Sequence, residues 1–189
     1  GKLEQIQALI EKGKYFTINR SRQYGKTTTL AALFRKLKDD YIVLRLSFEG
    51  IGSDAFQSDK HFVMYFIRSV AQALKFTSQS AEIIEEWKNK NAYEEEGYVD
   101  AFDYLSDKIA WLCKKSEKEI LLFIDEVDKT SDNQIFLNFL GMLRNKYIKR
   151  QEGLDYTFKS VILAGVYDIK NLKLKLRPDE EKKYNSPWN

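Results

Sequence analysis

The residue types best suited to hold a phosphate group are consecutive in the sequence: Gly25, Lys26, Thr27 and Thr28. A phosphate-binding loop needs backbone N–H groups at the start of a helix, a glycine that lets the main chain approach, and a cation. Gly25 would allow that approach, Lys26 would supply charge toward the β- and γ-phosphates, and the Thr27 hydroxyl would ligate Mg²⁺. These residues therefore predict a site for nucleotide phosphates.

The loop before Gly25 departs from the complete phosphate-loop pattern in one respect. The pattern G-x-x-x-x-G-K-[ST] begins with glycine, and Arg20 stands at that position here. Gln23 and Tyr24 directly precede Gly25 and are further candidates for nucleotide contact, although a packing role suits Tyr24 equally well. Because a bare Gly-Lys-Thr occurs by chance, the prediction depends on a strand before the loop and a helix after it.

A second group of candidate residues lies about 100 positions later, where residues 120–124 form an apolar run that ends at Asp125 and Glu126. A buried strand that delivers an acidic pair to its carboxyl end is the pattern of a Walker B element. Asp125 would hold Mg²⁺, and Glu126 would orient or deprotonate the attacking water. The alternative is a strand ending in a solvated acidic turn, since Asp128 and Lys129 follow.

The elements that must position these residues follow a regular alternation. Apolar runs predict four strands, and helical spacing of apolar residues predicts helices between them. Strand, helix and strand in succession form a βαβ unit, which requires parallel pairing. The expected fold class is therefore α/β, with three layers and a mainly parallel central sheet flanked by helices. The predicted strands comprise residues 14–19, 41–48, 119–124 and 158–164.

Three blocks of the sequence resemble the bacterial AAA-like ATPase domains, which are related to the signal-transducing ATPases with numerous domains (STAND). The blocks are the loop from Arg22 to Thr27, the acidic run from Asp125 to Asp128, and the stretch 185–189, Asn-Ser-Pro-Trp-Asn. The family's loop commonly lacks the first glycine, so the resemblance accommodates Arg20. It implies a P-loop fold of the ASCE class, in which residues 158–164 form a strand inserted between the two motif-bearing strands.

The motifs and the resemblance together imply ATP and Mg²⁺ as cofactors. The expected catalytic residues are Glu126 and Lys26, and the expected magnesium ligands are Thr27 and Asp125. Residues expected to contact the nucleotide are Gln23, Tyr24, Gly25, Lys26, Thr27 and Thr28.

Arginines and a γ-phosphate sensor are assigned less directly. Arg144 and Arg150 are candidate arginine fingers, although ordinary exposed helix arginines are the favoured interpretation. Arg20 and Arg22 flank the loop and could instead touch a phosphate or the following strand ends. Tyr167 and Asp168 follow the fourth strand, where such ATPases place a polar sensor, but a helix cap suits Asp168 better.

Composition excludes several other functions. The 189 residues carry 31 Lys and Arg against 28 Asp and Glu, with one Cys and one His. The single Cys113 excludes a disulfide framework, and the single His61 excludes a two-His metal site; we expect an inert thiol and a surface or capping histidine. No apolar run could span a bilayer, so the expected location is cytoplasmic. The basic run near residues 170–177 is followed by acidic residues, which favours a solvated face over nucleic acid.

Two functions remain open from the sequence. The first is slow ATP hydrolysis coupled to a conformational or signalling change in a larger protein, and the second is a nucleotide-binding switch or scaffold with little hydrolysis. A P-loop kinase or nucleic-acid enzyme lacks a recognisable acceptor site or basic groove. The expected partners are a nucleotide and either a further copy or a downstream effector domain. Residues 1–189 are expected to be one ATPase core cut from a longer chain, without its last strand and lid.

Overall fold

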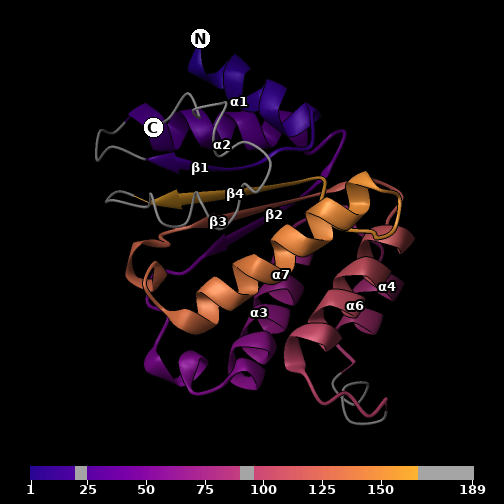
Figure 1. The fold of residues 1–189 in the computed structure, drawn as a ribbon. Helices are drawn as coiled ribbons and strands as arrows, with labels where there is room; N and C mark the ends of the chain where they lie inside the picture. The colour runs from indigo at the N-terminus through magenta and orange to yellow at the C-terminus, as the bar shows by residue number, and fades with distance from the viewer. Residues whose placement is uncertain (20–24, 90–95, 166–189) are drawn as a thin grey trace.

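A computed structural model of the protein describes residues 1–19, 25–89 and 96–165, of which 25–29 are described by backbone alone. Four parallel strands form one sheet in the order β1-β4-β3-β2 (Figure 1). The strands are β1 (Tyr15–Asn19), β2 (Ile42–Ser47), β3 (Ile120–Asp125) and β4 (Ser160–Gly165). The helices are α1 (Lys2–Glu11), α2 (Gly25–Leu37), α3 (Asp59–Leu74), α4 (Ala81–Trp87), α6 (Ala101–Lys115) and α7 (Gln134–Gln151), with short 3₁₀ turns η1 (Ser53–Phe56) and η2 (Asp128–Thr130).

The sheet is the middle of three layers, because its strands carry apolar side chains on both faces. Helices α1 and α2 cover one face, while α3, α6 and α7 cover the other and α4 packs against α3 and α6 (Figure 1). Within β3, Leu121 and Phe123 pack toward α1 and α2, whereas Leu122 and Ile124 pack toward α3, α6 and α7. The expected three-layer α/β architecture is confirmed.

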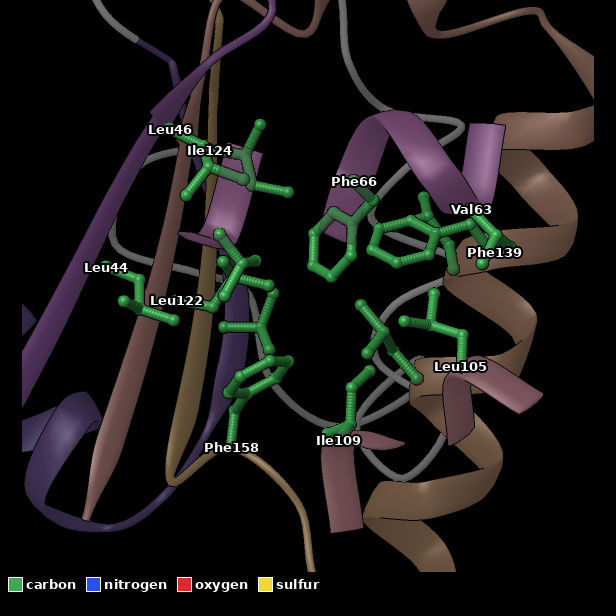
Figure 2. Close-up of a cluster of buried hydrophobic side chains, with 14 of the residues drawn as sticks. Leu44, Leu46, Val63, Phe66, Leu105, Ile109, Leu122, Ile124, Phe139 and Phe158 are labelled. Carbon is green, nitrogen blue, oxygen red and sulfur yellow. The ribbon is translucent and has the colours of Figure 1, made fainter. Parts of the chain in front are cut away.

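The larger core lies between the sheet and the α3 side and is rich in aromatic residues. Figure 2 shows Leu44 and Leu122 on the strands facing Phe66 and Phe139 on the helices. The rings of Phe66 and Phe139 lie 4.8 Å apart between centroids, a separation typical of favourable aromatic pairs. Burying each such side chain contributes about 1.5–3 kcal/mol, so this cluster fixes α3 and α7 against the sheet.

Burial differs from strand to strand in the sheet. The two inner strands, β3 and β4, are buried at nearly every position. By contrast, β2 alternates between buried and exposed or half-buried residues, whereas β1, the other outer strand, is buried from Tyr15 to Ile18. The outer position of β2 leaves Arg45 and Ser47 exposed on the α2 side.

Side-chain caps define where the helices of the α3 side begin. Ser58 accepts a hydrogen bond from the His61 N–H, and Asn133 accepts from the N–H groups of Ile135 and Phe136. Ser80 and Asp100 cap α4 and α6 in the same way. Caps of this kind each stabilise a helix by about 1 kcal/mol.

The predicted strands agree with the observed ones to within two residues at each end, and β4 lies between β1 and β3 as the resemblance implied. The helix predicted after β3 is longer than the expected 15 or so residues, since α7 has 18. Gly13, the predicted break between the first helix and strand, has φ of +71°, a value that favours glycine. Among the described residues, no helix is both long and apolar enough to cross a bilayer.

Candidate functional site

The phosphate-loop side of the candidate site begins where β1 ends, at Asn19. Helix α2 starts at Gly25, so Gly25, Lys26 and Thr27 form its first turn, and no acidic residue lies in that turn. The first turn of a helix presents unpaired backbone N–H groups and the positive end of the helix dipole. The required strand and helix are therefore both present. Gln23, Tyr24, Arg20 and Arg22 lie outside the described residues.

The acidic side of the site lies at the carboxyl end of β3. Asp125 is the last residue of β3 and is in register with Ser47 of β2. Alternation along β3 puts Asp125 on the same face as Leu121 and Phe123, which is the face that α2 covers. Asp125 is partly exposed, and its Oδ1 accepts a hydrogen bond of 2.8 Å from the Glu126 N–H. The carboxylate thus faces the layer that contains the phosphate-loop helix.

Glu126 has an unusual backbone conformation, with φ of +57°. This left-handed conformation costs a residue other than glycine about 1–2 kcal/mol. The chain directly after Glu126 is fixed in place. The Val127 N–H donates to the Ala164 carbonyl at 3.2 Å, and the Val127 side chain is fully buried. The Thr130 hydroxyl donates to the Val127 carbonyl at 2.9 Å. Anchoring on β4 therefore sustains a strained residue directly beside Asp125, an arrangement often found at functional sites.

The two sides meet at one edge of the sheet. Because all four strands are parallel, their carboxyl ends lie together, and β1 and β3 are separated by β4 alone. Their ends are therefore roughly 10 Å apart, at about 4.8 Å for each step between strands. The chain leaves β1 into α2 on one face and leaves β3 toward α7 on the other (Figure 1). In α/β folds, ligands bind at the carboxyl edge of the sheet where successive connections diverge in this way.

Arg150, one of the two candidate fingers, lies at the opposite edge of the sheet. Its Nη1 donates to the carbonyls of Phe158 at 2.6 Å and Lys159 at 3.3 Å, and its Nη2 donates to the Gly13 carbonyl at 3.1 Å. These three residues precede β4 and β1, so the guanidinium joins their amino ends. The expectation of an ordinary exposed arginine is wrong for Arg150, and its observed contacts are structural.

The other residues singled out in the sequence have plain structural surroundings. His61 is exposed, and its Nδ1 lies 2.7 Å from the hydroxyl of Ser58 at the start of α3, which confirms the predicted surface or capping place. Cys113 is partly buried, as predicted, and burial raises the pKa of its thiol to about 12. Arg144 is half-buried on α7. Tyr167 and Asp168 lie outside the described residues.

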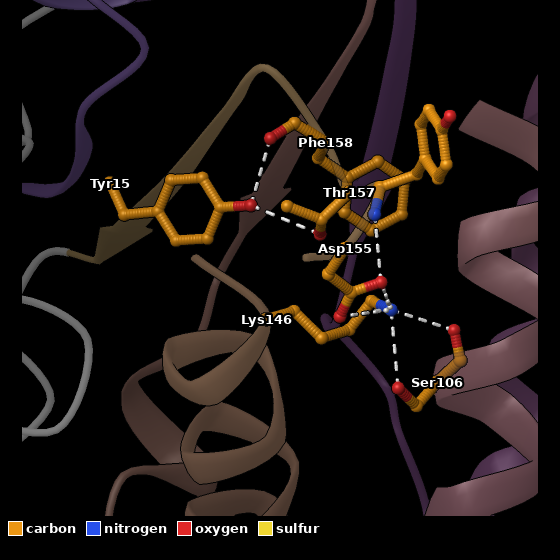
Figure 3. A network of polar contacts seen from close by, with 7 residues as sticks. Tyr15, Ser106, Lys146, Asp155, Thr157 and Phe158 are labelled. Atoms are coloured by element: carbon orange, nitrogen blue, oxygen red, sulfur yellow. Dashed lines mark hydrogen bonds and ion pairs between the residues drawn. The ribbon is translucent and has the colours of Figure 1, made fainter. Parts of the chain in front are cut away.

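A polar network that joins α7 and α6 was not predicted from the sequence. The Lys146 ammonium donates to the Ser106 carbonyl at 2.8 Å and to both carboxylate oxygens of Asp155, at 3.1 and 3.2 Å (Figure 3). Nearby, the Tyr15 hydroxyl donates to the Phe158 carbonyl at 2.8 Å. Spacing along α7 could have revealed Lys146, because it lies three residues after buried Leu143 on the apolar face.

The parallel sheet and the helix layers on its two faces are consistent with a P-loop NTPase-like fold. The chain belongs to the family described as the AAA-like domain, whose model matches residues 2–167. Neither the search of curated proteins nor that of solved structures gave a match. The AAA-like part of the resemblance is thus confirmed, while the relation to STAND ATPases and the bacterial source stay predictions.

Proposed function

We propose that this AAA-like domain binds ATP together with Mg²⁺ and hydrolyses it slowly, driving a conformational or signalling change in a larger protein. The observation that carries the proposal is the meeting of two motifs at one edge of the sheet. The first turn of α2 follows β1, and Asp125 and Glu126 end β3, with β4 between them. Membership of the AAA-like family supports nucleotide binding.

The proposed roles at the phosphate side follow from residue type and position. Gly25, Lys26 and Thr27 begin α2, where backbone N–H groups favour an anion. Lys26 would hold the β- and γ-phosphates by its charge, and Thr28, Gln23 and Tyr24 would complete the contacts with the nucleotide. The absence of acidic residues from the first turn of α2 favours this role, because a carboxylate there would repel a phosphate.

The donor set at the carboxyl edge fits Mg²⁺. Magnesium prefers oxygen ligands and is commonly held by one or two protein groups together with substrate phosphates and water. Asp125 offers a carboxylate that is partly exposed and oriented by the Glu126 N–H, and Thr27 has a hydroxyl by residue type. When bound, Mg²⁺ would neutralise charge on the phosphates. Asp125 and Thr27 are therefore the proposed ligands.

Glu126 is the proposed general base. A general base must lie close to the attacking water and accept its proton during the displacement. Glu126 follows the proposed magnesium ligand directly, and its backbone is held in a conformation that glutamate does not favour. The hydrogen bond from the Val127 N–H to the Ala164 carbonyl of β4 fixes the chain directly after Glu126. Lys26 would stabilise negative charge on the transferred phosphoryl group.

Nucleotide binding is tested with Lys26→Ala, matched to Lys36→Ala in the last turn of the same helix. A ligand at about 100 times its Kd stabilises the folded state by about 2.7 kcal/mol, which is a rise of roughly 5–11 °C in Tm for a chain of this size. ATP with Mg²⁺ should produce that rise in the parent and in Lys36→Ala, but not in Lys26→Ala. An equal rise in all three proteins would contradict the phosphate-loop assignment.

Phosphate release separates the two functions left open by the sequence. Continuous release of inorganic phosphate from ATP, dependent on Mg²⁺, is the expected result. ATP binding without release would instead favour the nucleotide-binding switch. A downstream effector domain or a further copy of the chain is the proposed partner, and the cytoplasm is the proposed location.

A further inference from the structure

The outer edge of β2 forms the floor of a groove on the surface of the domain. In the sheet order, β2 lies farthest from β1 (Figure 1), and within the described parts of the chain no strand pairs with its outer side. The N–H groups of Ile42 and Phe48 each donate to β3 residues or their neighbours at 2.9 Å. Because backbone direction alternates along a strand, the N–H and C=O groups of Val43 and Arg45 point outward.

The two walls of this groove differ in chemistry. The wall on the α2 side carries three cationic side chains, Arg35, Lys38 and Arg45, all exposed. On the other side, the groove is lined by Ala73 and Phe76, which lie at and just after the end of α3. Phe76 is 91% exposed, so its ring offers apolar surface beside the strand edge.

Few acidic side chains lie near the cationic side chains of the groove. Asp125, at the carboxyl end of the groove, is the one acidic residue among the side chains that line it. Within the described residues, no ion pair involves Arg35, Lys38 or Arg45. The Arg45 guanidinium instead lies over the Phe34 ring, 5.1 Å from its centroid. The groove therefore attracts negative charge on one side and apolar groups on the other.

We propose that β2 is a docking edge for an extended segment of a partner protein in which acidic and apolar residues alternate. Such a segment would add a strand beside β2, with main-chain hydrogen bonds to Val43 and Arg45. Side chains of a strand point alternately to opposite faces, so the acidic residues would meet Arg35, Lys38 and Arg45 while the apolar residues cover Phe76. Strand addition at β2 does not require nucleotide binding, although Asp125, a proposed magnesium ligand, lines the carboxyl end of the same groove.

Charge selects a partner protein over a second copy of this chain. Pairing of β2 with β2 of another copy would bring two cationic walls together, with Arg45 close to its own counterpart. Like charges on paired strands are destabilising, and a charged residue on an edge strand commonly prevents pairing with itself. An acidic segment removes that repulsion.

The probe for this proposal is a fluorescent peptide of about ten residues in which Glu and Val alternate, long enough to span an edge strand of usual length. Its control has the same composition, with all Glu residues first and all Val residues after them. Fluorescence anisotropy should show binding of the alternating peptide, with an affinity that falls as salt increases. No binding up to about 1 mM, or equal binding of the two peptides, would overturn the proposal.

Three variants of the domain locate the binding. Arg45→Glu should lower the affinity for the alternating peptide roughly tenfold, because the substitution replaces an attraction to the acidic side chains by a repulsion. Val43→Pro removes an outward N–H and should also weaken binding, while circular dichroism checks that the fold persists. Arg68→Glu, at an exposed position on α3 away from the groove, is the matched control and should bind as the parent does.

Two further measurements make the outcome unambiguous. Lys26→Ala should bind the peptide normally, so a failure of nucleotide binding does not affect this test. Sedimentation should show that the free domain does not associate through β2. A dimer that Val43→Pro dissociates would identify a second copy as the occupant and overturn the choice of an acidic partner.

Discussion

The main-chain N–H of Glu126 donates a hydrogen bond of 2.8 Å to the carboxylate of Asp125. Asp125 ends β3 on the face that α2 covers, whereas Glu126 turns the chain with φ of +57°. Two adjacent acidic residues therefore occupy different environments: one carboxylate is oriented by its neighbour's backbone, and the other residue carries the turn. This difference allows their proposed roles to be tested separately.

Asp125→Asn should weaken ATP binding in the presence of Mg²⁺ but not in EDTA. The amide oxygen of asparagine can still accept the bond from Glu126, so the fold should persist while the charge is lost. We expect affinity to fall by roughly tenfold, or about 1.4 kcal/mol. Calorimetric titration of ATP with and without Mg²⁺ measures the effect, and Asp132→Asn, an exposed nearby change, is the control. Equal losses with and without Mg²⁺ would point away from a metal ligand.

Glu126→Gln and Glu126→Gly should both slow phosphate release while differing in stability. Removing a general base costs about 10²–10⁴ in rate. Glycine adopts positive φ without the steric cost that glutamine retains, so Glu126→Gly should have the higher free energy of unfolding, by about 1 kcal/mol. Urea unfolding and a phosphate assay on the same samples measure both. A glycine variant less stable than the glutamine variant would mean that side-chain contacts, not strain, dominate at this position.

Much of the fold could be predicted because the strands are apolar runs in a chain otherwise rich in charge. Residues 120–124 are buried between two helix layers, and that burial requires the unbroken apolar stretch visible in the sequence. The place of β4 between β1 and β3 came from the family resemblance. No periodicity within the chain specifies the order of strands, because pairing depends on contacts between residues far apart in the sequence, such as Tyr15 with Val161 and Ile42 with Ile120.

The contacts of Arg150 and Lys146 could not be read in the same way. In a helical pattern a charged residue usually indicates a solvated face. Arg150 was expected to follow that rule, and no role was predicted for Lys146. The partner atoms of Arg150 are backbone carbonyls, including that of Gly13, which any residue type provides. The Lys146 partners, Ser106 and Asp155, lie on α6 and in the segment before β4, so only the packed structure brings them together.

Arg150→Ala should destabilise the domain without altering hydrolysis by the folded fraction. Its guanidinium donates hydrogen bonds to three backbone carbonyls at the amino edge of the sheet. Its loss leaves the carbonyl oxygens of Gly13 and Phe158 without this donor. We expect a loss of roughly 2–4 kcal/mol, and Arg150→Lys should recover little, because an ammonium cannot reproduce the planar fork. Mixing Arg150→Ala with Glu126→Gln protein tests action between copies. Turnover restored by mixing would support the arginine-finger alternative instead.

Lys146→Met and Asp155→Ala should lower the free energy of unfolding by different amounts, although both break the same ion pair. The Lys146 side chain is 3% exposed and that of Asp155 is 16% exposed, so only the carboxylate has appreciable access to water once its partner is gone. Asp155→Ala leaves a buried ammonium with Ser106 alone and should cost about 3–5 kcal/mol. Lys146→Met keeps the volume and removes the buried charge, so its cost in urea unfolding should be smaller. The reverse order would show that hydrogen bonds to Ser106 outweigh the buried charge.

The thiol of Cys113 should resist alkylation in the folded protein and make stability fall at high pH. Burial raises its pKa to about 12, and a thiol reacts as the thiolate, so roughly one thiol in ten thousand is ionised at pH 8. Unfolded protein, with an ordinary cysteine pKa near 8.5, should be labelled about a thousand times faster.

The sign of the pH dependence follows from the same shift. Between the unfolded and folded pKa values the unfolded state binds fewer protons, so the free energy of unfolding decreases as pH rises from about 9 to 12, by up to about 1.4 kcal/mol per pH unit. Burial also raises the pKa of the Tyr15 hydroxyl, which acts in the same direction above pH 10. Urea unfolding across this range should therefore show a shallower decline for Cys113→Ala than for the parent. Identical slopes would mean that Cys113 titrates alike in the folded and unfolded states.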